Sequence, residues 1–178
     1  NPSAAMSEPR TPIVFYLDAA IPEPIRGAMR EGALAWNKAF EAAGFSNAIR
    51  VLDAPTPEQD PNWSPEDVTI NVIRWVPQEN VNAMGPRVTD PRSGETLSAH
   101  IQVWPQVIDG FGQYYWGLFG GSGVDAGAAR LPLSTEKSGA LLSYVVAHEV
   151  GHTLGLMHNQ IASTAHTVAQ MRNPAFAN

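Results

Sequence analysis

The chain has 178 residues, a length that favours a single domain with a sizeable core. Charged residues make up 16% of it, against roughly 25% in typical soluble domains, while 15 glycines and 15 prolines exceed average usage. This composition predicts a folded domain with much irregular connection. The net charge of −6 comes without a lysine or arginine cluster, which argues against nucleic acid or an anionic membrane surface as a partner.

The sequence has no cysteine and no long apolar segment. Disulfides and thiolate metal ligands are therefore excluded. The absence of cysteine is compatible with an oxidising or a reducing compartment. No apolar run reaches the roughly 18 residues of a membrane span. The opening segment NPSAAMSEPRTP is polar and proline-rich, unlike a signal peptide, so we expect a flexible leader over residues 1–12 and one domain over 13–178.

The first part of the chain has a strand, helix, strand pattern. Residues 13–17 (IVFYL) predict a buried strand, and residues 49–52 predict a second one. Between them the apolar residues recur at helical spacing, which predicts one amphipathic helix of about five turns that begins near Pro22 and stops at Gly44. Its apolar face comprises Ile25, Met29, Ala33, Trp36 and Phe40.

The middle of the chain is predicted to add a loop, a strand and a hairpin. Residues 53–67 are rich in proline and acid, and a solvated loop is favoured over a calcium site because the oxygen ligands lack a recognisable loop spacing. Residues 68–76 are the most strand-like stretch of the chain. Residues 83–89 and 96–104 flank the turn DPRSG, which predicts a β-hairpin whose alternating second arm suits an edge or half-exposed strand.

The last part is predicted to carry the second long helix. Residues 105–133 mix aromatic residues with glycines and predict only a short helix around 114–119, followed by a loop. Ser134 is a suitable N-cap for a helix that runs to Gly155. The order of these elements favours an α+β or mixed α/β domain, with a mixed, twisted sheet packed on two long helices.

The motif HEVGHTLGLMH, at residues 148–158, carries the strongest chemical signal. Residues four apart on a helix are about 40° apart around the axis and about 6 Å apart along it, so His148 and His152 can bind one ion. A third protein ligand has to approach from another direction. Gly155 can adopt a positive φ, end the helix and bring His158 back to the metal.

Zinc is the ion that this ligand set favours. Three neutral imidazoles suit Zn²⁺, although copper or nickel could bind if they were available. Glu149 is adjacent to His148 and is interpreted as a general base that takes a proton from the attacking water, a role that a purely structural zinc would not need. His100 and His166 match no ligand spacing and are interpreted as surface histidines.

The motif resembles the zinc site of the metzincin metallopeptidases. The chain is also similar to the catalytic region of a large bacterial family of zinc-dependent metalloproteases, through PIVFYLD, EGALAWNKAFEAAGF, VLDAP, IRWV, NAMGPRVTDPRSGE and VVAHEVGHTLGLMHN, a likeness that spans residues 12–176. The resemblance implies zinc ligands at His148, His152 and His158, with Glu149 as general base. It also implies a metzincin-like fold, in which the strand Leu97 to Trp104 is the edge that pairs with an extended peptide.

The chain departs from the metzincin pattern after the third histidine. Metzincins place a methionine in a tight turn under the metal, and Met171 is the only candidate downstream of His158, in the sequence QMRNP. In the bacterial family that turn lies beyond Asn178, which leaves open that the catalytic domain is truncated. The tyrosine that some metzincins use after this turn has no counterpart, because every tyrosine precedes His158: residues 16, 114, 115 and 144.

The main functional hypothesis is a zinc-dependent endopeptidase that hydrolyses polypeptide substrates, with Glu149 as general base. The alternative is a catalytically silent, zinc-containing or metal-free module that binds a peptide or a partner. A zinc amidase that acts on other substrates is a third possibility. The family likeness leads us to expect export from a bacterial cell, whereas cleavage specificity, a propeptide and the oligomeric state are not encoded in any motif found.

Overall fold

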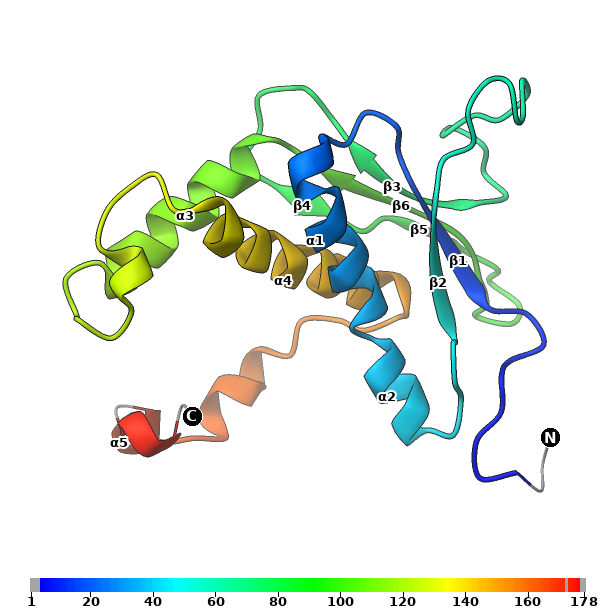
Figure 1. Ribbon diagram of the computed structural model, residues 1–178. Coiled ribbons are helices and arrows are strands. Elements are labelled where there is room, and N and C mark those ends of the chain that lie inside the picture. Colours follow the sequence, from blue (N-terminus) through cyan, green and yellow to red (C-terminus); the bar gives the residue numbers. More distant parts are fainter. Residues whose placement is uncertain (1–3, 172, 177–178) are drawn as a thin grey trace.

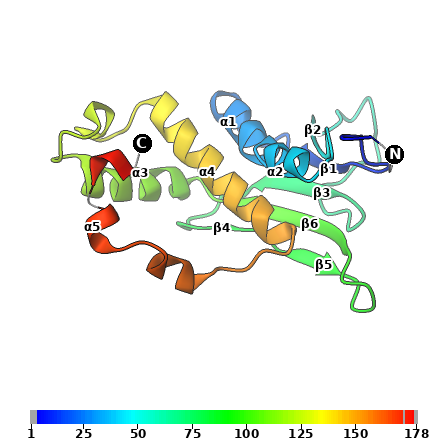
Figure 2. The ribbon, with the colours of Figure 1, turned by 90° about the horizontal axis from the view of Figure 1, so that it is seen from below.

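A computed structural model describes residues 4–171 and 173–176, and it shows a mixed sheet packed against helices (Figures 1 and 2). The strands are β1 Ile13–Leu17, β2 Ile49–Asp53, β3 Asn71–Trp75, β4 Ala83–Met84, β5 Arg87–Thr89 and β6 Thr96–Val103. The α-helices are α1 Glu23–Leu34, α2 Asn37–Ala42, α3 Gln106–Phe119, α4 Thr135–Thr153 and α5 Val168–Met171, with short 3₁₀ turns at Ala126–Ala128, Gln160–Thr164 and Pro174–Phe176. None of the helices in these described ranges has the length and apolar character needed to cross a bilayer.

The sheet has parallel strands in the order β2-β1-β3-β6, followed by the antiparallel strands β4 and β5, which both pair with β6. Helices α1 and α4 lie against one face of this sheet (Figure 1). The core between them combines strand residues such as Phe15 and Ile101 with helix residues such as Met29 and Val146, all of which are almost completely buried. The predicted combination of a mixed sheet with helices is therefore present.

One prediction about the sheet is wrong: the segment Leu97 to Trp104 is not an edge strand. Its strand, β6, pairs with β3 on one side and with β4 and β5 on the other. The open edge on that side of the sheet is formed by residues 83–89. The alternation in LSAHIQVW indicates which side chains lie on each face of the sheet. It does not predict whether both backbone edges of the strand have hydrogen-bonded neighbours.

The first predicted helix is present as two helices, because the chain breaks at Ala35 and Trp36. The break lets the Trp36 indole donate from Nε1 to the carbonyl of Ala147, at 2.7 Å, and pack over Gly151 in α4. A Cβ at Gly151 would lie 2.8 Å from Trp36 Cζ2, so only glycine allows this close approach. Gly44 ends α2 with a φ of 90°, as a C′ glycine does.

Other predicted boundaries differ, most of all at the start of α3. Helix α3 begins at Gln106, well before the predicted 114–119, and β3 is shorter than the predicted 68–76. The predicted hairpin of β5 and β6 is confirmed, and Gly94 in its turn has a φ of 77°. In the predicted leader, Ser7 exchanges backbone hydrogen bonds with Gly44 and Ser46. The flexibility of this segment in solution stays a prediction.

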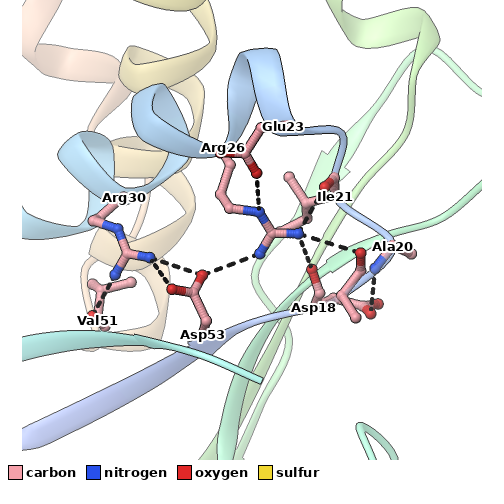
Figure 3. A network of polar contacts seen from close by, with 9 residues as sticks. Asp18, Ala20, Ile21, Glu23, Arg26, Arg30, Val51 and Asp53 are labelled. Atoms are coloured by element: carbon pink, nitrogen blue, oxygen red, sulfur yellow. Dashed lines mark hydrogen bonds and ion pairs between the residues drawn. The ribbon is translucent and has the colours of Figure 1, made fainter. Parts of the chain in front are cut away.

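A network of charges ties α1 to the ends of β1 and β2 (Figure 3). Asp53, at the end of β2, accepts hydrogen bonds from Arg30 at 2.8 Å and from Arg26 at 3.1 Å. Arg26 also donates to the main-chain carbonyls of Asp18 and Ile21, which follow β1. Both guanidinium groups are thus used to fix the helix on the sheet, so we assign this network a structural role.

A second polar cluster joins α3 to α4 through Asp125. The carboxylate accepts hydrogen bonds from the Tyr115 hydroxyl at 2.6 Å and the Gly127 amide at 2.8 Å, and it forms an ion pair with Lys137 at 2.7 Å. The Lys137 ammonium and the Tyr115 hydroxyl lower the pKa of Asp125 from 3.8 to about 2. The ionised form of Asp125 is therefore the one that the folded state prefers.

Replacing Asp125 by asparagine should make the folded protein less stable in a pH-dependent way. Because the folded-state pKa is depressed, the stabilisation is fully present above the unfolded pKa near 3.8 and is lost as the pH falls towards about 2. Melting temperatures from pH 6 to pH 2 should therefore differ most at pH 6 and converge in acid. Asp109→Asn, an exposed change in α3, should follow the wild-type profile, and a constant difference for Asp125→Asn would contradict this assignment.

Candidate metal centre

Helix α4 carries three of the four functional residues of the motif, His148, Glu149 and His152. It begins after Ser134, whose hydroxyl oxygen accepts a hydrogen bond from the Lys137 amide at 3.2 Å. Its middle is buried through Leu142, Val145 and Val146 against the sheet and α1. His148, Glu149 and His152 then occupy the last turns of the helix, where burial on one side leaves the two imidazoles facing the opposite side.

The three histidines of the motif converge on one point. The Nε2 atoms of His148 and His158 are 3.0 Å apart, those of His148 and His152 are 3.0 Å apart, and those of His152 and His158 are 3.1 Å apart. Around a tetrahedral zinc with Zn–N bonds of about 2.0–2.1 Å, the ligand nitrogens would be separated by about 3.3 Å. The donor set therefore fits a zinc ion. In the described ranges this is the one cluster of at least three potential ligand side chains.

A helix-ending turn brings His158 to this point. Gly155 has a φ of 101°, and its amide donates to the carbonyl of His152 at 3.0 Å. The amide of Leu156 donates to the carbonyl of Gly151 at 3.1 Å. Together these bonds form a Schellman motif, which reverses the chain at a left-handed residue. A side chain at position 155 would be strained in that conformation.

The orientation of the His152 ring leaves Nε2 free to bind a metal. Nδ1 of His152 lies 2.9 Å from the carbonyl oxygen of Leu156, which can only accept a hydrogen bond. The proton therefore resides on Nδ1, and Nε2 presents its lone pair to the cluster. For His148, burial and the neighbouring His152 and His158 lower the pKa, which favours the neutral, metal-binding form.

Glu149 lies beside the histidine cluster and is 7% exposed. Burial raises its pKa, although His152, His158 and a hydrogen bond from the Gly85 amide act in the opposite direction. A carboxylate with a raised pKa is a stronger proton acceptor than an exposed one. Position 85 is in close contact with this residue, because a Cβ there would lie 2.5 Å from the Glu149 carbonyl oxygen.

A cleft of about 420 Å³ lies between the histidines and the open edge of the sheet. It is lined by residues 82–86 on one side and by the motif residues His148, Glu149, His152 and His158 on the other. A second cavity of about 220 Å³ continues from His148 and Glu149 towards α3 and is largely apolar, with walls that include Val81, Ala83, Phe111 and Val145. The histidine cluster therefore opens onto both hollows, which meet at His148 and Glu149.

The structure does not place Met171 beneath the histidines. After His158 the chain forms a 3₁₀ turn at Gln160–Thr164 and then α5, which lies below α3 and away from the end of α4 in both views (Figures 1 and 2). Met171 is 56% exposed there. The prediction of a methionine turn at this residue is therefore corrected, because Met171 is the last residue of the short helix α5 and lies away from the histidines.

The remaining histidines lie outside the cluster. His100 is in β6, and its Nε2 is 3.1 Å from the carbonyl oxygen of Asp67. The ring of His166 packs against Phe176, with the ring centroids 4.7 Å apart. Sequence reasoning missed two residues next to the metal centre, Gly85 and Arg87. The dipeptide Gly85-Pro86 inside a strand pattern was the available signal, since an isolated glycine there marks a bulge or a close backbone approach.

The geometry described so far defines a three-histidine metal site with an adjacent carboxylate. Residues 130–178, which include α4 and all three histidines, match a family described as Met-zincin. No curated protein and no solved structure matches the chain. The family match and the histidine cluster together indicate a metallopeptidase-like module with a site suited to zinc.

Proposed function

We propose that the chain is a zinc-dependent endopeptidase. The observation that carries this proposal is the convergence of three Nε2 atoms beside the buried carboxylate of Glu149, at the floor of a cleft with an open strand edge. A metal site used only for structure would need neither the carboxylate nor the cleft. The bacterial, exported setting expected from the family likeness is part of the same proposal.

The open edge of the sheet offers backbone groups to a peptide. In the pairing of this edge with β6, the carbonyls of Asn82 and Pro86 accept bonds from the amides of Trp104 and His100. In an antiparallel ladder, the residues between such pairs direct their N–H and C=O groups outwards. Ala83, Gly85 and Arg87 therefore have backbone groups on the side away from β6. An extended peptide can add to this edge as a further strand.

The chemistry expected at the cluster divides between the metal and the protein. When bound, zinc lowers the pKa of a water ligand and stabilises negative charge on the peptide carbonyl oxygen. Glu149 accepts the proton that the water releases as its oxygen attacks the carbonyl carbon, and then delivers this proton to the leaving nitrogen. The C–N bond breaks, and a carboxylic acid and an amine are formed from one peptide bond and one water molecule.

The proposal predicts metal-dependent cleavage of an unstructured polypeptide. Protein loaded with one equivalent of zinc should degrade casein, and a chelator should abolish the activity because the three histidines then hold no Lewis acid. Adding zinc back should restore it. Zinc binding without cleavage of casein or of a peptide library would instead favour the silent binding module. Cleavage confined to small non-peptide amides would favour the amidase.

A further inference from the structure

The end of the metal-binding helix is held from the side by the hairpin of β5 and β6. The guanidinium of Arg87, the first residue of β5, donates a hydrogen bond to the carbonyl oxygen of His152. The hydroxyl of Thr96, the first residue of β6, donates to the carbonyl oxygen of Thr153 at 3.1 Å. Both carbonyls belong to the last turn of α4, where the helix has no further backbone N–H groups to donate to its C=O groups.

Arg87 reaches the helix because alternate residues of this edge face it. Met84 lies opposite Gln102 and Arg87 lies opposite Ala99, so the register continues unbroken through Gly85 and Pro86. Positions 83, 85 and 87 are partly buried towards α4, whereas positions 84, 86 and 88 are exposed. The assigned strand is interrupted because proline has no N–H to donate to β6.

The hairpin fixes the relative position of its two contacts. Its turn is closed by hydrogen bonds from the Asp90 amide to the Glu95 carbonyl and from the Gly94 amide to the Asp90 carbonyl, both at 2.8 Å. A guanidinium at the C-terminus of a helix is also favoured by the helix dipole. The two side chains therefore cap α4 as one unit.

The capped residues are those that set the metal geometry. His152 supplies both the carbonyl that Arg87 holds and the imidazole that enters the cluster. The Schellman turn that returns His158 to the cluster begins from the same carbonyl, which also accepts the Gly155 amide. A shift of this last turn would therefore move two of the three ligands relative to His148.

We propose that Arg87 and Thr96 are positioning residues of the metal centre, which hold the last turn of α4 so that the three histidines keep their metal-binding arrangement. This inference rests on the zinc site of the proposed function but does not require that the protein cleave peptides. Residues that orient metal ligands typically change metal affinity or activity by about 10–100-fold when they are replaced.

The test compares zinc affinities of capping variants with matched controls. Arg87→Met, Thr96→Val and the double variant are titrated with zinc in competition with a chromophoric chelator. We expect the double variant to bind zinc about 10–100-fold more weakly than wild type, with each single variant in between. Arg87→Lys and Thr96→Ser, which keep a donor, should recover part of the loss. Arg92→Met and Thr89→Val, exposed changes in the same hairpin, should bind zinc as wild type does.

Two further measurements separate positioning from general destabilisation. The melting temperature of the zinc-free variants reports loss of fold stability, and the absorption spectrum of cobalt(II)-loaded protein reports ligand geometry. An altered cobalt spectrum with a folded zinc-free protein supports the proposal. Wild-type zinc affinity in the double variant overturns it, and so does weaker binding that merely follows unfolding with an unchanged spectrum. Failure of the wild type to cleave peptides would refute the proposed function alone.

Discussion

Replacing Glu149 by glutamine should remove nearly all peptide hydrolysis while leaving zinc binding intact. Among the described residues that line the cleft, Glu149 is the acid beside the histidine cluster, and its loss removes the group that accepts the proton of the attacking water. General base catalysis typically contributes on the order of 10²–10⁴-fold, so kcat should fall by that factor. Zinc content measured by elemental analysis should stay at about one equivalent, because Glu149 is not among the three ligands.

The matched control for this variant is Glu136→Gln. Glu136 lies in the first turn of the same helix, is exposed, and is remote from the cleft. Its replacement should leave kcat, KM and zinc content unchanged. Turnover by Glu149→Gln within a few fold of wild type would rule out this residue as the base. Loss of zinc from Glu149→Gln would instead show that the carboxylate helps to hold the metal.

The fold was predictable where side-chain periodicity determines it. The predicted apolar face faces the core as its spacing predicts, with Met29 and Ala33 buried and the other members partly buried. The turn around Gly94 forms the predicted hairpin. The break at Ala35 and Trp36 was not predicted, and it coincides with a hydrogen bond from Trp36 to Ala147, which is distant in the sequence. A regular apolar pattern is unchanged when a helix bends at one residue, so the pattern alone cannot locate the break.

The position of the open sheet edge was predicted incorrectly for a related reason. Strand alternation reveals which residues face the core, whereas pairing depends on the neighbours of each backbone edge. The segment from 83 to 89 contains Gly85 and Pro86, which weaken any strand pattern, so β6 was the better match to an edge strand. The convergence of the three histidines, in contrast, follows from helix geometry and one glycine turn. Local spacing was therefore enough to predict this cluster.

Replacing Gly85 by alanine should lower kcat sharply without removing the metal. An added Cβ would lie 2.5 Å from the backbone oxygen of Glu149, and an ordinary contact needs about 3.5 Å, so the strand edge must retreat by about 1 Å. Such a displacement moves the bound peptide and the Gly85 amide away from the carboxylate. A misplacement of this size can cost about 10²-fold in rate, and we expect kcat to fall by a comparable factor. KM should rise as well, because the displaced edge pairs less well with the peptide.

The control for Gly85→Ala is an alanine at a glycine position where the added Cβ makes no close contact. Gly117 in α3 has no atom within 4 Å of a Cβ, so Gly117→Ala should leave kcat and KM unchanged. Zinc affinity should equal that of wild type in Gly117→Ala. Gly85→Ala should still bind about one equivalent of zinc, because the three atoms nearest to the added Cβ all belong to Glu149. Its zinc affinity should fall only as far as the displaced edge moves Arg87 away from the His152 carbonyl. Wild-type kcat and KM in Gly85→Ala would mean that substrate binding does not use this edge. The substrate would then have to bind along another wall of the cleft. The apolar cavity towards Phe111, which Glu149 also lines, is one such wall.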